Sequence, residues 1–156
     1  MQIKTSVLEA QPFLKGMAAG QLELLAADSM SAEFKAGEMI ISEGGPANRF
    51  YLILGGQVVL ESSAMEGKVT HIQTLGAGDV LGWSWLFPPY YWHFDARAVT
   101  PTQAIFFYGT HLRELCAENH DLGYELMKRV SEIVIKRLQA TQGELMECNK
   151  HLHLPV

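Results

Sequence analysis

The middle of the chain repeats its apolar residues with a period of two, and short glycine-rich segments interrupt the repeat at close intervals. Apolar side chains that alternate with polar ones are typical of strands with one buried face. The alternating positions are Phe34, Met39, Ile41, Phe50, Leu52, Leu54, Val58, Leu60, Val69, His71, Gln73 and Leu75. The glycine-rich turn segments are 35–38, 43–46, 55–56, 66–68 and 76–79. With two further strands expected at 95–99 and 104–108, the pattern predicts an antiparallel sandwich or jelly roll.

One turn signal is specific enough to predict a connection. Gly55 and Gly56 separate the apolar run that ends at Leu54 from the run that begins at Val58. Two glycines between strands favour a two-residue β-hairpin, because such turns need positive φ angles. We therefore expect these two runs to pair in one sheet.

Helical patterns flank the strands on both sides. Residues 1–31 predict short helices, with a break at Pro12 and a second helix over 21–27. After the strands, Thr110 and Asp121 are candidate N-caps for a short helix and a long one. The expected organisation is a single domain over 1–156, divided into N-terminal helices (1–31), a jelly roll (32–108) and C-terminal helices (109–148).

The expected long helix, Leu122 to Cys148, carries an apolar stripe. Its members, spaced by three or four residues, are Met127, Val130, Val134, Leu138, Thr141 and Leu145. A helix of this length extends beyond a small β sandwich, so we expect it to pair with the same helix of a second copy in a homodimer. The alternative is that it packs entirely on its own domain.

Composition limits the classes of function. The formal net charge of −5 disfavours a general nucleic-acid surface. Cys116 and Cys148 lack metal-site spacing and form no disulfide framework, which indicates a reducing compartment, the cytoplasm. No signal peptide and no apolar run of bilayer-spanning length is recognisable, so we expect no membrane partner.

All three tryptophans lie in one stretch, Gly78 to His93, which also contains the Pro88-Pro89 pair. Adjacent prolines exclude a helix interior and a central strand, so this stretch is expected to be a loop or a short turn of helix. A loop this aromatic either plugs one end of the β fold or covers a ligand pocket.

The order of segments resembles the cyclic-nucleotide-binding domain of the catabolite-activator and protein-kinase regulatory-subunit superfamily, over about Pro12 to Gln142. The resemblance rests on the segments 13–17, 34–40, 43–44, 50–58 and 75–82, whose glycines fall where the family turns between strands. It implies an eight-stranded jelly roll (a double-stranded β-helix) with N-terminal helices and a C-terminal hinge helix. It also implies that the segment after Gly82 is a phosphate-binding cassette.

In the family, that cassette begins Gly-Glu and has a downstream Arg; the Glu holds a ribose hydroxyl, and the Arg and helix amides hold a cyclic phosphate. Here Gly82 is present, Trp83 stands at the Glu position, and His93 is nearest the Arg position. Trp83 cannot accept the hydrogen bond of a ribose hydroxyl, since an indole only donates. His93 is a poor substitute for the Arg on the phosphate, since an imidazole is mostly neutral. Thr141 matches a family Thr that meets the adenine, or it simply packs. The candidate ligand-binding residues are Gly82, Trp83, Ser84, Trp85, His93 and Thr141.

Three classes of function follow. The first is a regulatory module that binds a small molecule under the aromatic loop and repositions the long helix. The second is a dimeric interaction scaffold whose pocket is plugged by its own tryptophans; weak or atypical cyclic nucleotide binding is a further alternative. The third, an enzyme, is not expected, because no catalytic motif appears and the only His-x-His pair, His151 and His153, lies in the tail. No metal site is expected, and the sequence identifies no cofactor.

The resemblance also bears on DNA binding. A helix-turn-helix module would need roughly fifty residues after the hinge helix. Since the sequence ends at Val156, we expect no direct contact with nucleic acid.

Overall fold

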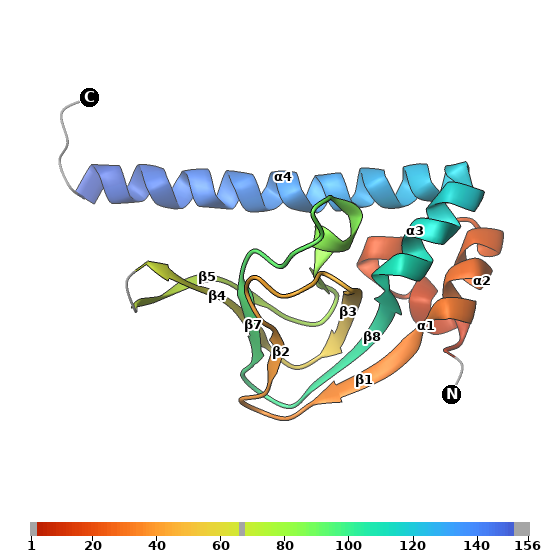
Figure 1. The fold of residues 1–156 in the computed structure, drawn as a ribbon, viewed down its shortest axis with the longest axis horizontal. Coiled ribbons are helices and arrows are strands. Elements are labelled where there is room, and N and C mark those ends of the chain that lie inside the picture. Colours follow the sequence, from red (N-terminus) through yellow and green to blue (C-terminus); the bar gives the residue numbers. More distant parts are fainter. Residues whose placement is uncertain (1–2, 66–67, 152–156) are drawn as a thin grey trace.

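Eight strands form two four-stranded antiparallel sheets, with helices at one end and along one side (Figure 1). The computed structural model describes residues 3–65 and 68–151. The strands are β1 (Met30–Phe34), β2 (Met39–Ile41), β3 (Arg49–Gly55), β4 (Val58–Met65), β5 (Lys68–Leu75), β6 (Val80–Leu81), β7 (Asp95–Ala98) and β8 (Thr102–Tyr108). One sheet has the order β1-β8-β3-β6 and the other β2-β7-β4-β5. This is the expected jelly roll.

Strand β3 shows how the period of two builds two cores. Phe50 and Leu52 point into the core between this sheet and the helices, whereas Tyr51 and Ile53 point into the core between the two sheets. All four side chains are buried. Strand β8 alternates in the same way, with Ile105 and Phe107 on the helical side and Ala104 and Phe106 on the other. The two strands pair directly, so they form the double-faced centre of the fold.

The expected Gly55-Gly56 hairpin is wrong. Strand β3 lies in one sheet and β4 in the other, so the two glycines carry the chain between sheets. Gly56 has φ +97°, and a Cβ there would approach the Pro101 carbonyl oxygen to 2.6 Å. The glycine therefore satisfies a close backbone approach at the crossover. A glycine pair marks a tight turn equally well in both connections, so the pattern could not distinguish them.

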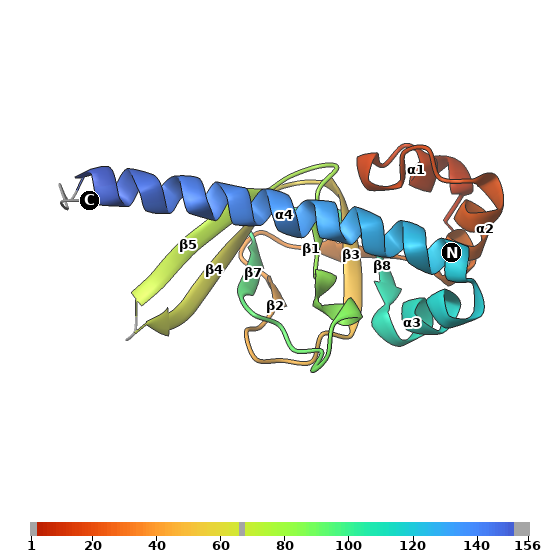
Figure 2. The same cartoon turned by 90° about the horizontal axis from the view of Figure 1, so that it is seen from above.

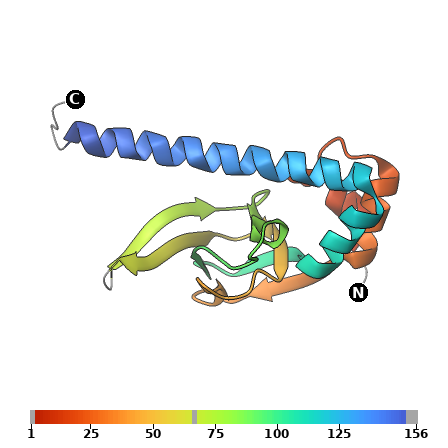
Figure 3. The ribbon, with the colours of Figure 1, turned by 45° about the horizontal axis from the view of Figure 1, so that its top comes forward.

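The helices are α1 (Thr5–Glu9), the 3₁₀ helix η1 (Pro12–Leu14), α2 (Ala19–Asp28), the 3₁₀ helix η2 (Trp83–Leu86), α3 (Gly109–Glu118) and α4 (His120–His151). Each of the two expected caps is displaced: α3 begins before Thr110, and α4 begins before Asp121. Strand β1 begins two residues earlier than the expected boundary at Ala32. Figures 2 and 3 show α4 running past the strands, with its C-terminal half projecting beyond the sheet that contains β3.

Burial along α4 changes at Arg137. Before it, Leu122, Leu126 and Val130 are buried against the helical side of β3 and β8. After it, every described side chain from Leu138 to Cys148 is exposed. Of the expected stripe, Val130 is buried and Val134 is half-buried. The remaining members, Met127, Leu138, Thr141 and Leu145, are exposed.

Two sequence expectations fall partly outside the described residues: the turn at 66–68 and the His151–His153 pair. In the part of the chain that is described, no helix combines the length and the apolar composition that crossing a bilayer requires.

Candidate functional site

The segment 82–93, here called the cassette, begins with a glycine that no other residue replaces easily. Gly82 has φ +92°. A Cβ at this position would lie 2.8 Å from Cη2 of Trp92 and 2.9 Å from the carbonyl oxygen of Arg49. The left-handed backbone and the two close contacts turn the chain sharply out of β6 into η2.

The helix η2 buries the centre of the cassette. Trp85 has no exposed surface, and Ser84 is also buried. The Trp85 ring lies 5.8 Å from the Phe50 ring, at an interplanar angle of 52°. Through Phe50, the cassette thus joins the core on the helical side of β3.

Three buried polar atoms of η2 have no hydrogen-bond partner among the described residues. They are Trp83 Nε1, Ser84 Oγ and Trp85 Nε1. Each can donate a hydrogen bond, and a buried donor without a partner costs about 1–3 kcal/mol. Such groups are rare in folded proteins, and their concentration in one turn of helix marks this segment as unusual.

The second half of the cassette is fastened by its backbone to the β2–β3 connection. The Ala47 amide donates to the Tyr90 carbonyl at 2.6 Å, and the Trp92 amide donates to the Gly45 carbonyl at 2.8 Å. The Gly44 amide donates to the Trp92 carbonyl at 2.9 Å. These bonds hold the cassette closed at its C-terminal end.

Arg113 of α3 holds the middle of the cassette, and sequence reasoning missed it. Its Nη1 donates to the Trp85 carbonyl at 2.6 Å, and its guanidinium lies 4.2 Å from the Tyr90 ring centroid. The contact spans 28 residues of sequence. No local pattern connects them, although an Arg near an aromatic loop is a common cation–π partner.

Arg137 of α4 contacts the strand that leads into the cassette. Its Nη2 donates to the Val80 carbonyl at 3.0 Å, two residues before Gly82. Burial lowers the pKa of Arg137, and the charge of Asp79 partly opposes this change. The cassette is therefore tied to α4 at its start and to α3 in its middle.

The six expected ligand-binding residues do not all meet. Gly82, Trp83, Ser84 and Trp85 are contiguous, and the His93 ring lies 6.0 Å from the Trp83 ring. Thr141 is apart from this group, on the exposed half of α4, where its hydroxyl donates to the Arg137 carbonyl at 2.9 Å. It packs against nothing in the apolar core, so neither expected role is visible in the protomer.

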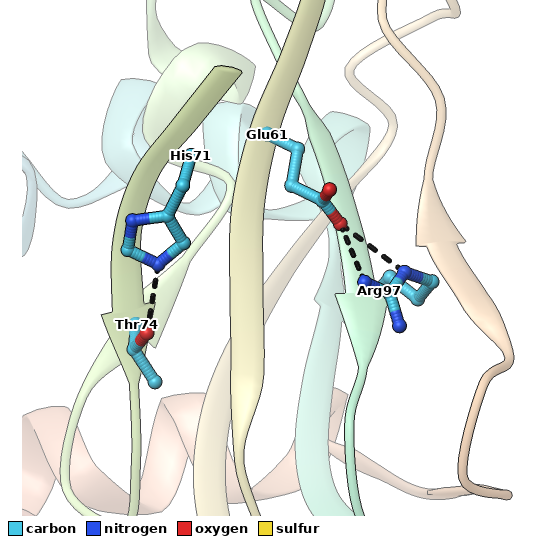
Figure 4. Close-up of polar contacts among 4 residues, drawn as sticks. All are labelled: Glu61, His71, Thr74 and Arg97. Carbon is cyan, nitrogen blue, oxygen red and sulfur yellow. Dashed lines mark hydrogen bonds and ion pairs between the residues drawn. The ribbon is translucent and has the colours of Figure 1, made fainter. Parts of the chain in front are cut away.

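The contacts of Arg113 and Arg137 are described above. The other three of the chain's five arginines contact groups outside the cassette. Arg97 of β7 pairs with Glu61 of β4, with Nη2 and Oε1 2.9 Å apart (Figure 4). In the same view, the His71 Nε2 and the Thr74 Oγ1 of β5 lie 2.9 Å apart. Arg49 lies over the Phe106 ring, and Arg129 donates to the carbonyls of Phe13 and Lys15.

Other chemistry is sparse around the cassette. Over residues 3–65 and 68–151, no group of three or more His, Cys, Asp or Glu side chains is arranged to hold a metal ion. Four cavities found in these residues are lined by side chains outside the cassette. Trp85 and Trp92 are instead buried in the two cores.

Comparison with known proteins agrees with this architecture. The family profile "Cyclic nucleotide-binding domain" matches residues 31–119. A crystal structure from Geobacter metallireducens, of a protein assigned to the cyclic nucleotide-binding proteins, is 30% identical with a TM-score of 0.79. The match covers 87% of this chain and 98% of that one.

Two further relatives belong to larger proteins. The CRP-like cAMP-activated global transcriptional regulator of Mycobacterium tuberculosis is 22% identical over 141 residues, which is 90% of this chain and 61% of the relative. The chain thus spans about three fifths of that regulator. The regulatory subunit of a cAMP-independent protein kinase A from Trypanosoma brucei is 25% identical, with a TM-score of 0.71. That match covers 90% of this chain and 49% of the other.

Proposed function

Because the chain belongs to the cyclic nucleotide-binding domain family, we propose that it is a non-catalytic regulatory sensor. A small molecule binds beneath the cassette, and the cassette passes the change to the C-terminal helices. The family's known members in the comparison are regulators, which supports the regulatory class. The relatives support only the regulatory class. The kind of ligand and the response of the helices are proposed for this chain from its own residues.

The observation that carries the proposal is the set of three unpartnered donors in η2. Trp83 Nε1, Ser84 Oγ and Trp85 Nε1, on three consecutive residues, are each buried without an acceptor among the described residues. A ligand with carbonyl, carboxylate or phosphate oxygens would supply acceptors, and the indole faces would stack on an apolar or aromatic portion. Such a ligand enters only if the cassette opens, since Trp85 and Trp92 are buried in the closed arrangement.

Two arginines couple that opening to the helices. Arg113 bonds the carbonyl of Trp85, and Arg137 bonds the carbonyl of Val80. Movement of η2 therefore strains or breaks a contact to α3, and movement of β6 does the same to α4. A ligand that binds only the open cassette shifts the equilibrium between the closed and open states. The size of this shift is set by the difference in the ligand's affinity for the two states.

Ser84→Ala tests the proposal, because it separates binding from stability. Removing an unpartnered buried hydroxyl leaves the free energy of unfolding unchanged or raises it by up to about 1 kcal/mol. A ligand that bonds this hydroxyl loses about tenfold in affinity. Tryptophan emission reports binding, since all three tryptophans lie in the cassette, and cyclic AMP, cyclic GMP and a library of nucleotides and aromatic carboxylates are the probes.

The matched control is Ser29→Ala. Ser29 is also buried, but its hydroxyl donates to the Ala26 carbonyl at 2.7 Å. We expect this variant to lose about 1 kcal/mol of stability and to keep its ligand response. An emission spectrum that no probe changes would refute the sensor, as would a response that Ser84→Ala leaves intact.

A second candidate function is a dimeric scaffold with a self-plugged pocket. It is favoured by the complete burial of Trp85 and by the absence of a cassette-lined cavity among those found in the described residues. On this hypothesis the cassette is structural, and the exposed half of α4 carries the function. A silent probe screen with a stable dimer supports the scaffold over the sensor.

We expect calorimetry with cyclic AMP and cyclic GMP to show no binding tighter than about micromolar. The wild-type cassette offers no carboxylate for the ribose and no arginine for the phosphate, so the ribose hydroxyl and the phosphate charge of a bound nucleotide lack their usual partners. The cAMP-independent kinase subunit of T. brucei indicates that a similar protein can dispense with cAMP.

The double variant Trp83→Glu with His93→Arg restores both groups and should gain measurable affinity. Trp83→Glu alone is the control, because it supplies the ribose contact without the phosphate contact. A submicromolar dissociation constant for the wild type would contradict this reading of the cassette.

A further inference from the structure

A second candidate binding region lies beside β6 and α4, outside the cassette. It is a cleft of about 310 Å³ between η1, the β5–β6 turn and α4. Its lining residues are Pro12, Phe13, Gln73, Leu75, Gly78, Asp79, Val80, Arg129, Glu132, Ile133, Lys136 and Arg137. None of them belongs to the cassette, so this cleft is a separate feature of the fold.

The cleft contains a cation without an ionic partner. Arg137 donates one hydrogen bond from Nη2 to a backbone carbonyl, while its Nη1 is covered and has no partner among the described residues. No carboxylate in residues 3–65 and 68–151 forms an ion pair with it within 4.0 Å. A buried charge without compensation is costly, and proteins normally pair such a group.

The neighbouring charges supply only part of that compensation, because the charge of Asp79 acts on Arg137 without forming an ion pair with it. Asp79 is exposed, and its Oδ2 accepts a hydrogen bond from the Gly76 amide at 2.8 Å. Glu132 is also exposed, so water screens it. Arg129 is already bonded to two backbone carbonyls and to Glu125. Lys136 is exposed and makes no hydrogen bond or ion pair in the described part of the chain.

The remaining wall is apolar. Phe13 and Leu75 are buried residues of the two cores, and Ile133 packs against the same core as Phe13. A cleft of this volume is at the lower end of the range for small-molecule sites. It therefore combines an apolar wall with two cationic side chains that lack anionic partners.

We propose that this cleft binds a small organic anion, a carboxylate or phosphate monoester with an apolar body. The anionic group lies beside Arg137 and Lys136, and the apolar body lies on Phe13, Leu75 and Ile133. Charge-assisted contacts of this kind are among the strongest that a side chain makes. The site does not rest on the function proposed above, although it shares Arg137 and Val80 with the contact between α4 and the strand that leads into the cassette.

Amide chemical shifts of the ¹⁵N-labelled full chain test this proposal, with phenyl phosphate and benzoate as anionic probes. Benzyl alcohol is the neutral probe of similar shape. We expect the anions to shift the amides of Gly78, Val80 and Ile133 more strongly than those of 82–93. The ratio of the two anionic affinities identifies phosphate or carboxylate as the preferred group.

Arg137→Met should lower the affinity for the preferred anion at least tenfold, and Arg137→Lys should lower it less. The matched control is Arg97→Met, which removes an arginine that is paired with Glu61 on the strands. Lys136→Met should also weaken binding, and this exposed position provides the test if Arg137→Met does not fold.

Four results would overturn the proposal. They are equal affinities for benzyl alcohol and the anions, shifts centred on 82–93, full affinity in the folded Arg variant or in Lys136→Met, and no shift up to roughly 10 mM probe. Shifts at the cleft with no change in tryptophan emission would support this site while the cassette hypothesis failed. A change in tryptophan emission without shifts at the cleft would support the cassette hypothesis and exclude this site.

Discussion

Trp85→Ala should lower the free energy of unfolding by about 3–5 kcal/mol, a large part of the stability of an ordinary domain. Trp85 is 0% exposed and packs on Phe50 in the core that joins the cassette to β3. Replacing the indole with a methyl group leaves a cavity that η2 cannot easily close, because Arg113 fixes the Trp85 carbonyl. Urea denaturation followed by circular dichroism measures the change.

Tyr91→Ala is the control for that variant. Tyr91 belongs to the same segment but is 51% exposed, so its loss should change stability by no more than about 0.5 kcal/mol. Trp85→Phe should fall between the two, since it keeps a ring and removes the unpartnered indole N–H. If Trp85→Ala costs less than 1 kcal/mol, the cassette is not anchored by this side chain.

The second large effect concerns the oligomer. We expect the protein to form a homodimer through α4, and Leu138→Asp with Leu145→Asp to raise the dimer dissociation constant at least a hundredfold. Leu138 is 56% exposed and Leu145 61% in the protomer, so the changes leave the protomer's own core intact. Analytical ultracentrifugation over a range of protein concentrations measures the constant.

The spacing along α4 identifies the face that would pair. Alternating steps of three and four residues connect Tyr124, Met127, Ser131, Val134, Leu138, Thr141 and Leu145, the repeat of a coiled-coil seam. Gln139 and Met146 have the same seven-residue separation one position further along. Gln139→Asp with Met146→Asp therefore adds the same charge away from the seam and should leave the dimer intact. A wild-type protein that sediments as a monomer would exclude this interface.

The fold could be predicted because its signals are local or repeated. The period of two gave the strands, and the two cores on either side of β3 follow from that alternation. The connection between β3 and β4 could not be predicted, because Gly55-Gly56 serves a hairpin and a crossover equally well. The helices α3 and α4 begin one residue before Thr110 and Asp121, a shift within the one or two residues by which helix boundaries ordinarily vary.

The candidate site divides in the same way. Gly82 and its neighbours were found because the turn and the aromatic residues are contiguous in the sequence. Arg113 and Arg137 were not expected to hold the cassette, because their partners are backbone carbonyls far away in the sequence. Every residue has a backbone carbonyl, so no pattern of side chains predicts which carbonyl will accept a hydrogen bond from a given arginine. Thr141 matched a family position, yet its contacts in the protomer are confined to its own helix.

The contact between Arg137 and Val80 has a thermodynamic consequence. It joins the last buried turn of α4 to the entrance of the cassette, and the exposed seam continues directly beyond it. If dimerisation and ligand binding both act on this contact, each changes the other's equilibrium constant by the same factor. The apparent ligand affinity would then depend on protein concentration, and the ligand would change the dimer dissociation constant in proportion. The cell's level of this protein would itself set the ligand concentration to which it responds.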